Sequence, residues 1–221
     1  MVRPISVQVR LIRLDVPILI ACSTILMLFL ANGSLSRLEG FVLIGGIIAY
    51  LAFTVLVALR SADSNLAVYQ GALGARTSLA DPMLVVAGLA ALVLGSILFV
   101  DGAVAIARGM GVAEVVIGLS LVACGTSLPE LATSVVAAAK GEGDISVGNI
   151  VGSNIFNILA LLGVVGAVSP LRTTVGMADV GASLLLALLL LPFMRSGFRL
   201  SRSEGAVLVG LYLLYLLWLT S

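Results

Sequence analysis

The sequence has no histidine, and its only two cysteines, Cys22 and Cys124, lie far apart within apolar runs. Without histidine, the chain cannot form His-containing zinc sites, histidine-ligated haem or catalytic pairs that use imidazole as the base. Two distant cysteines support neither a disulfide scaffold nor a four-thiolate metal site. Charged residues make up 10% of the chain, whereas soluble domains carry roughly 25%. The net charge of +1 is too small to suggest a nucleic-acid partner.

Apolar residues take the place of the missing charge, at 61% of the chain, with a mean hydropathy of +1.23. About 20 such residues cross the hydrocarbon core as a helix. Seven stretches of about that length are found, at 16–32, 38–59, 83–105, 113–140, 145–167, 175–194 and 203–221. We therefore expect an all-α multi-pass membrane protein with about seven transmembrane helices and the lipid bilayer as its partner. We expect no enzyme activity, catalytic residue or cofactor.

The basic residues predict the orientation of these spans, because Lys and Arg gather on the cytoplasmic side. Nine fall on one side: Arg3, Arg10, Arg13, Arg60, Arg76, Lys140, Arg195, Arg199 and Arg202. Three fall on the other: Arg37, Arg108 and Arg172. We therefore expect a cytoplasmic N-terminus and an outside C-terminus, in a prokaryotic cell (inner) membrane. Reading the first stretch as a signal peptide is the alternative, but the internal repeat argues against it.

The first two spans resemble the last two. The segment Leu35–Gly40 reads LSRLEG, and the segment Leu200–Gly205, 165 residues later, reads LSRSEG. The similarity extends to further pairs, namely Val42-Leu43 with Val207-Leu208, Tyr50 with Tyr215, and Asp15-Val16 with Asp179-Val180. Five membrane crossings separate the start of the first copy from the start of the second. Because five is an odd number, the two copies have opposite orientation in the membrane. Inverted repeats are typical of secondary transporters, whose substrate site lies at the midplane between the halves.

The second copy is preceded by three spans within 83–167, whereas almost nothing precedes the first. We therefore expect that a three-span block precedes Met1 in the complete protein or is supplied by another chain.

The fourth span carries a glutamate, Glu130, near its middle. A carboxylate at this depth costs at least about 2.5 kcal/mol, so a role without a partner is improbable. Thr126 and Ser134 share its helix face at four-residue spacing. Pro129 has no N–H, so the carbonyl of Gly125 loses its helical partner. The opened helix thus offers oxygen ligands, which Ca²⁺ and Na⁺ require; a proline kink with satisfied hydroxyls is the structural alternative.

The fifth span carries Asn149, Ser153 and Asn157 at four-residue spacing, which gives one continuous polar face. Gly148 and Gly152 form a Gly-x-x-x-Gly pair that permits close helix packing. Packing explains the glycines but not the amides and the hydroxyl. We expect either an ion-binding face or hydrogen bonds between helices.

The segments Gly125–Glu130 (GTSLPE) and Gly148–Asn157 (GNIVGSNIFN), in this order and spacing, resemble the second α-repeat of the sodium/calcium exchangers, in the Ca²⁺:cation antiporter superfamily. Members of this family have ten helices in two inverted halves of five. The resemblance implies that residues 1–59 are the last two spans of the first half. Residues 60–82 would form a cytoplasmic linker, and residues 83–221 a complete second half.

This resemblance implies Na⁺/Ca²⁺ antiport by alternating access, with Glu130 coordinating both ions. Thr126, Ser127 and Ser153 would supply hydroxyl or carbonyl oxygens, and Ala123 a backbone carbonyl. Asn157 stands where several relatives have aspartate, which leaves the Na⁺ stoichiometry open. The family's first α-repeat has no counterpart in these 221 residues.

Two other functions are compatible with the sequence. The chain could be a non-transporting membrane subunit that packs against a partner, or an exchanger coupled to H⁺ or K⁺. An intramembrane hydrolase is disfavoured, because the chain has no histidine and Glu130 is its only carboxylate deep in a span.

Overall fold

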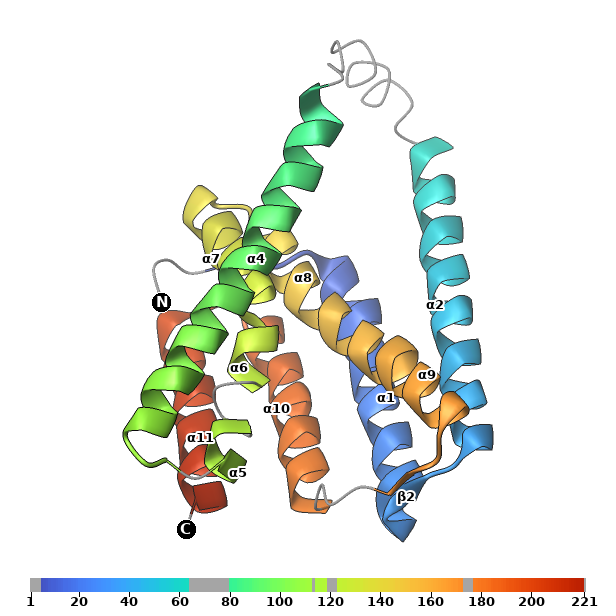
Figure 1. Ribbon diagram of the computed structural model, residues 1–221. Helices are drawn as coiled ribbons and strands as arrows, with labels where there is room; N and C mark the ends of the chain where they lie inside the picture. Colours follow the sequence, from blue (N-terminus) through green and yellow to red (C-terminus); the bar gives the residue numbers. More distant parts are fainter. Residues whose placement is uncertain (1–4, 64–79, 113, 119–122, 173–176, 221) are drawn as a thin grey trace.

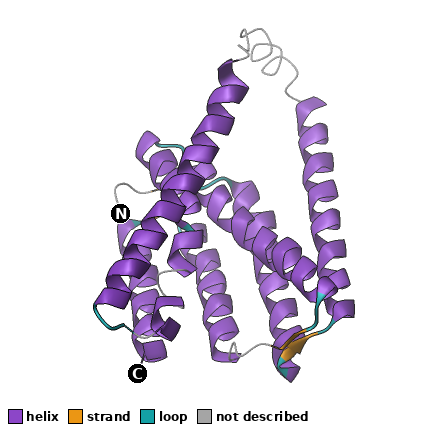
Figure 2. Cartoon of the chain, in the orientation of Figure 1, coloured by secondary structure: helices purple, strands orange, loops and turns teal. Residues whose placement is uncertain are grey.

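A computed structural model describes residues 5–63, 80–112, 114–118, 123–172 and 177–220. Helices form nearly all of this part of the chain, and the strands are only two residues long (Figure 2). The predicted linker at 60–82 lies largely outside the described residues, since α2 ends at Asp63 and α4 begins at Ala80. An all-α architecture, as expected from the composition, is confirmed.

The elements follow the apolar pattern of the sequence closely (Figure 1). The first repeat copy contains β1 (Ile5–Ser6), η1 (Leu11–Asp15), α1 (Val16–Phe29), η2 (Leu30–Asn32), β2 (Ser34–Leu35) and α2 (Arg37–Asp63). The middle of the chain contains α4 (Ala80–Gly109), α5 (Glu114–Ile117), α6 (Ala123–Thr126), α7 (Leu128–Lys140), α8 (Gly143–Phe156), η4 (Asn157–Leu161) and α9 (Leu162–Val168). The second copy contains β3 (Leu171–Arg172), α10 (Met177–Arg195), β4 (Arg199–Leu200) and α11 (Arg202–Thr220).

Five helical stretches in the described residues are long and apolar enough to cross a membrane: Leu11–Asn32, Arg37–Arg60, Ala80–Gly109, Gly143–Val168 and Ala178–Arg195. They match five of the seven predicted spans. The seventh corresponds to α11, an apolar helix of 19 residues. The predicted fourth span is described only in part, as α5, α6 and α7, and it is interrupted at Ser127 between α6 and α7.

The core is built around α1, which packs against α10, α8 and η4. Val16 of α1 and Ile155 of α8 are fully buried, and Met194 of α10 joins the same cluster. Most other apolar side chains are exposed, including those along nearly all of α4. This distribution suits a protein whose outer surface faces lipid.

The internal repeat is confirmed by matching hydrogen bonds at the start of α2 and of α11. Glu39 Oε2 accepts from both the backbone N–H and the hydroxyl of Ser36, each at 2.7 Å. Glu204 Oε2 accepts from the same two groups of Ser201, also at 2.7 Å. Both are capping boxes, in which a serine and a glutamate three residues later satisfy the free donors of a helix start.

A second matched pair joins the helices within each copy. The Tyr50 hydroxyl donates to Asp15 Oδ1 at 3.2 Å, and the Tyr215 hydroxyl donates to Asp179 Oδ1 at 2.7 Å. The residues paired by sequence comparison therefore make equivalent contacts.

The two copies exchange strands. In the antiparallel pair β1–β4, Ile5 lies opposite Leu200, and in the pair β2–β3, Leu35 lies opposite Leu171. Each copy thus gives its first strand to the second strand of the other copy. A two-fold relation between the copies produces this pattern, which is the arrangement expected of an inverted repeat.

Helix α2 approaches α9 closely enough to require glycine, and Figure 1 shows the α8–α9 helix ending against the start of α2. A Cβ on Gly40 would collide with the backbone nitrogen of Ala167 and lie 2.9 Å from the carbonyl oxygen of Gly163. Backbone atoms cannot move aside as a side chain can. Small residues at such crossings are the usual means of helix association in membranes.

We expect the substitution Gly40→Ala to lower the free energy of unfolding by about 1–3 kcal/mol, the usual cost of overpacking. Gly45→Ala is the matched control on the same helix, because a Cβ there meets no heavy atom within 4 Å. The control should be neutral or slightly stabilising. Thermal unfolding in detergent compares the two variants, and equal stabilities would contradict the proposed close contact.

Candidate functional site

The predicted helix break is present immediately before Glu130. Helix α6 ends at Thr126, Ser127 adopts a turn conformation (φ −97°, ψ 4°), and α7 starts at Leu128. Pro129 lies in the first turn of α7, where its missing N–H costs no hydrogen bond. The proline thus starts a new helix instead of kinking a continuous one, and the break places Thr126 and Ser127 at a helix junction.

Glu130 lies in the first turn of α7. Its Oε2 atom is buried and has no hydrogen-bond partner among the described residues. The partial positive charge of a helix N-terminus favours a carboxylate at this position. A buried carboxylate oxygen still requires a proton, a donor or a cation. Glu130 is therefore the strongest candidate ligand in the described chain.

Asn149 holds α8 against α7. Its Nδ2 amide donates to the Glu130 carbonyl at 3.1 Å, to Thr133 Oγ1 at 2.9 Å and to Ser134 Oγ at 3.0 Å. Asn149 thus makes hydrogen bonds between helices through its amide group. The contact fixes the backbone next to Glu130 to the fifth predicted span.

Ser153 and Asn157 lie further along the same span. The Ser153 hydroxyl donates to the carbonyl of Ile150 at 3.1 Å, which keeps its oxygen lone pairs available. Asn157 is the first residue of η4, a π-helical turn, and such turns are frequent at functional sites. Asn157 lines a pocket of about 360 Å³ that also includes Ser23, whose hydroxyl is buried, and Asp179.

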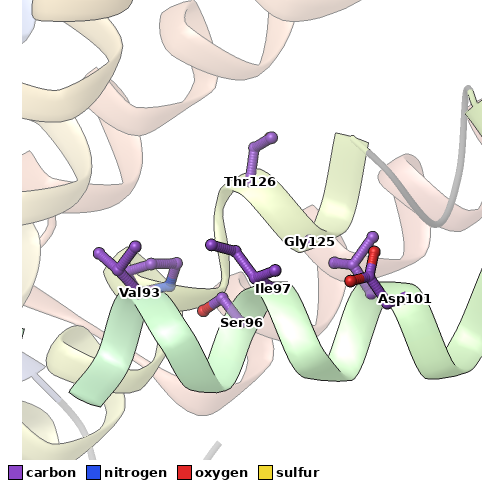
Figure 3. A pocket seen from close by; sticks show the side chains of 8 residues that line it. Val93, Ser96, Ile97, Asp101, Gly125 and Thr126 are labelled. Atoms are coloured by element: carbon purple, nitrogen blue, oxygen red, sulfur yellow. The ribbon is translucent and has the colours of Figure 1, made fainter. Parts of the chain in front are cut away.

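A second pocket, of about 340 Å³, lies where α4 faces the α6–α7 break. Figure 3 shows side chains of α4, including Ser96 and Asp101, beside the turn that carries Gly125 and Thr126. A Cβ on Gly125 would collide with Val100 Cγ2, so a glycine is needed for this approach.

Asp101 is another residue of this pocket, and the sequence did not single it out. Helix α4 continues to Gly109, beyond the predicted end of the span at residue 105. Asp101 therefore lies eight residues, or about 12 Å, inside the helix end. Its helical spacing from Val93 and Ile97 would have placed it on the same side of the helix.

The six predicted ligands are therefore divided between different parts of the structure. Thr126, Ser127 and Glu130 lie at the break, whereas Ser153 and Asn157 lie along α8 and η4. Ala123 is the first residue of α6, and its proposed carbonyl ligation stays a prediction. No group of three or more His, Cys, Asp or Glu side chains gathers within the described residues. A cation at Glu130 would thus depend mainly on neutral oxygen ligands.

We expect Asn149→Ala to lower the free energy of unfolding by about 1–3 kcal/mol, because buried polar groups on α7 lose their donor. Asn154→Ala is the control, since Asn154 is exposed and donates only within its own helix, to Ile150, at 2.8 Å. Thermal unfolding in detergent measures both effects. An Asn154 variant that loses as much stability as the Asn149 variant would argue against the interhelical role.

Inverted repeats of membrane-spanning helices, with a broken helix and a buried carboxylate, are the features of a secondary transporter. The family described as "Sodium/calcium exchanger protein" matches residues 81–221. The chain belongs to this family, as the family match and its relatives together show.

Three relatives illustrate this membership. The chain is 39% identical to the putative antiporter CaxA of Alkalimonas amylolytica, over 97% of this chain and 70% of that protein. It is 34% identical to the inner membrane protein YrbG of Escherichia coli, over 77% of this chain and 54% of that protein. It is 40% identical to the sodium/calcium exchanger MaX1 of Methanosarcina acetivorans, over 62% of this chain and 39% of that protein.

The fold is similar to that of a solved transporter, the sodium-calcium exchanger NCX_Mj. The two structures align with a TM-score of 0.77 at 27% identity, covering 99% of this chain and 69% of that chain. The predicted antiporter fold is thereby confirmed.

Proposed function

We propose that this chain exchanges Na⁺ for Ca²⁺ across the membrane by alternating access, with Glu130 as the ligand that both ions share. The observation that carries this proposal is the buried, unpartnered Oε2 of Glu130 beside a helix break. The names of CaxA, an antiporter, and of MaX1, a sodium/calcium exchanger, support it.

The proposed ligands are all oxygen donors, as Na⁺ and Ca²⁺ require. Glu130 supplies the charge, and the hydroxyls of Thr126, Ser127 and Ser153 supply neutral oxygens. Asn157 supplies an amide oxygen, and Ala123 a backbone carbonyl. With an amide at Asn157, these ligands carry a single negative charge.

Sharing one carboxylate would couple the two ions. A single carboxylate charge cannot neutralise both ions, and the two cations repel each other at this distance, so binding of one weakens binding of the other. An empty site would carry an uncompensated charge inside the membrane, which is costly. The ion-bound protein therefore switches between its inward-open and outward-open states more readily than the empty protein does. This difference favours exchange over leak.

We further propose that a three-span segment completes the site by packing against the second repeat copy. The α8–α9 helix packs along α2, with glycine at the crossing. By the two-fold relation, α11 should receive an equivalent helix, yet in the described chain it packs mainly against α10. Large apolar side chains of α11, including Leu213 and Leu217, are exposed on it.

The test is Na⁺-driven uptake of ⁴⁵Ca²⁺ into vesicles that contain the chain, alone and together with a co-expressed three-span segment from a relative such as CaxA. We expect uptake with the segment and little without it. Glu130→Gln keeps the shape of the side chain but removes its charge, so uptake should fall at least about 100-fold, as expected for a loss of roughly 3 kcal/mol.

Glu142→Gln is the matched control, because Glu142 lies exposed in the turn between α7 and α8. Uptake should be unchanged in this variant. Full exchange by Glu130→Gln would refute the proposed ligand, whereas exchange by the chain alone would refute the need for a docking segment.

A further inference from the structure

We propose that four arginines form a binding site for the phosphate of an anionic phospholipid. They are Arg10, Arg13, Arg195 and Arg199. We call this group the arginine cluster. The proposal concerns the membrane surface and is independent of which ions the protein exchanges.

The exchange of strands between the repeat copies brings these arginines to one face. Arg199 lies in β4 opposite Ser6 of β1, and the backbone N–H of Val7 donates to the carbonyl of Phe198 at 2.9 Å. Arg10 and Arg13 follow within the next two helical turns, as η1 packs on α10. Arg195 closes the last turn of α10. Segments almost 200 residues apart thus contribute to one basic surface.

The arginine cluster is exposed and lacks acidic partners. All four side chains are exposed. None forms a salt bridge to any residue that the structure describes; the ion pair recorded there joins Arg108 and Glu114 elsewhere.

The neighbouring acids on this face accept other hydrogen bonds. Asp144 accepts from the backbone N–H of Gln8 at 2.7 Å. Glu204 accepts from Ser196 and Ser201, at 2.8 and 2.7 Å. These carboxylates lower the local positive charge, but they hold no arginine of the cluster.

The repeat provides an internal comparison that separates folding from function. The hairpin 195–202 reads RSGFRLSR, and its equivalent on the opposite face, 30–37, reads LANGSLSR. Both hairpins turn through residues with positive φ, Gly33 in the first copy and Gly197 and Phe198 in the second. Leu30 and Ser34 stand where Arg195 and Arg199 stand, so this turn forms without the two arginines.

The stretch before the first helix of each copy shows the same asymmetry. Between Ser6 and Asp15 the sequence is VQVRLIRL, with two arginines, whereas between Arg172 and Asp179 it is TTVGMA, with no charge. None of the four arginines therefore has an arginine at the equivalent position of the other copy. The hairpin of the other copy forms with Leu30 and Ser34 at the positions of Arg195 and Arg199, so the shared fold does not depend on these two arginines.

Phospholipid headgroups fit this surface by charge and by position. Arg13 and Arg195 lie at the ends of two helical stretches that are long and apolar enough to cross a membrane, where lipid headgroups are expected. Guanidinium groups bind phosphate oxygens through two parallel hydrogen bonds. Clusters of basic residues at membrane helix ends are typical of anionic lipid recognition. The alternative role is to set orientation during insertion, for which any positive charge suffices.

The test uses the full chain in detergent micelles with dioleoylphosphatidylglycerol or dioleoylphosphatidylcholine, and native mass spectrometry counts the bound lipid. We expect a clear preference for the anionic lipid. The double variant Arg195→Leu/Arg199→Ser introduces the two residues that stand at the equivalent positions of the other hairpin, so it should fold. Its preference should fall at least about tenfold, as each arginine contributes about fivefold.

A second variant, Arg195→Lys/Arg199→Lys, keeps the charge but loses the guanidinium geometry, and its preference should fall about two- to threefold. Arg37→Gln, on the opposite face, should keep the preference of the unmodified chain. Equal binding of the two lipids by the unmodified chain would overturn the proposal. An unchanged preference in either double variant would overturn it as well.

Discussion

A carboxylate inside a membrane must be neutralised, and this constraint accounts for the arrangement around Glu130. The helix break, the proline that starts α7 and the neighbouring hydroxyls provide a polar environment that a continuous apolar helix would lack. Asn149 ties the same backbone to α8, so the polar groups on α7 are satisfied by protein while one oxygen of Glu130 is not. This oxygen is therefore the atom at which we propose that a cation binds and leaves.

The second organising feature is the two-fold relation between the repeat copies. It is visible at three levels: capping boxes, tyrosine–aspartate hydrogen bonds and exchanged strands. Because the two copies have equivalent folds, their differences become informative. Positions that differ in charge between the copies, such as Leu30 and Arg195, do not serve the shared fold and can be assigned to one membrane face.

Much of this fold was predictable from the sequence, because apolar stretches and the LSRxEG repeat are strong signals. Pro129 correctly predicted the helix break. The strands were not predictable, since two residues carry too little pattern to identify a pairing partner. The sequence also did not separate the roles of the polar residues on α8. Asn149 and Asn157 share a periodicity, but only the packing of α7 shows that Asn149 is hydrogen-bonded. Asp101 was not singled out, because only the approach of α4 to the α6–α7 break shows that it lines a pocket.

The pairing of β1 with β4 has a consequence for biosynthesis. It joins Ile5 to Leu200, so the strand of the first copy finds its partner only after the ribosome has made almost 200 further residues. Contacts between distant segments form slowly and leave early segments unpaired in the meantime. The spans of the first copy therefore lack the β1–β4 pairing until the hairpin at 195–202 has been made. An early stop in translation would leave the first copy in the bilayer with its strand unpaired, a form that quality-control proteases could recognise.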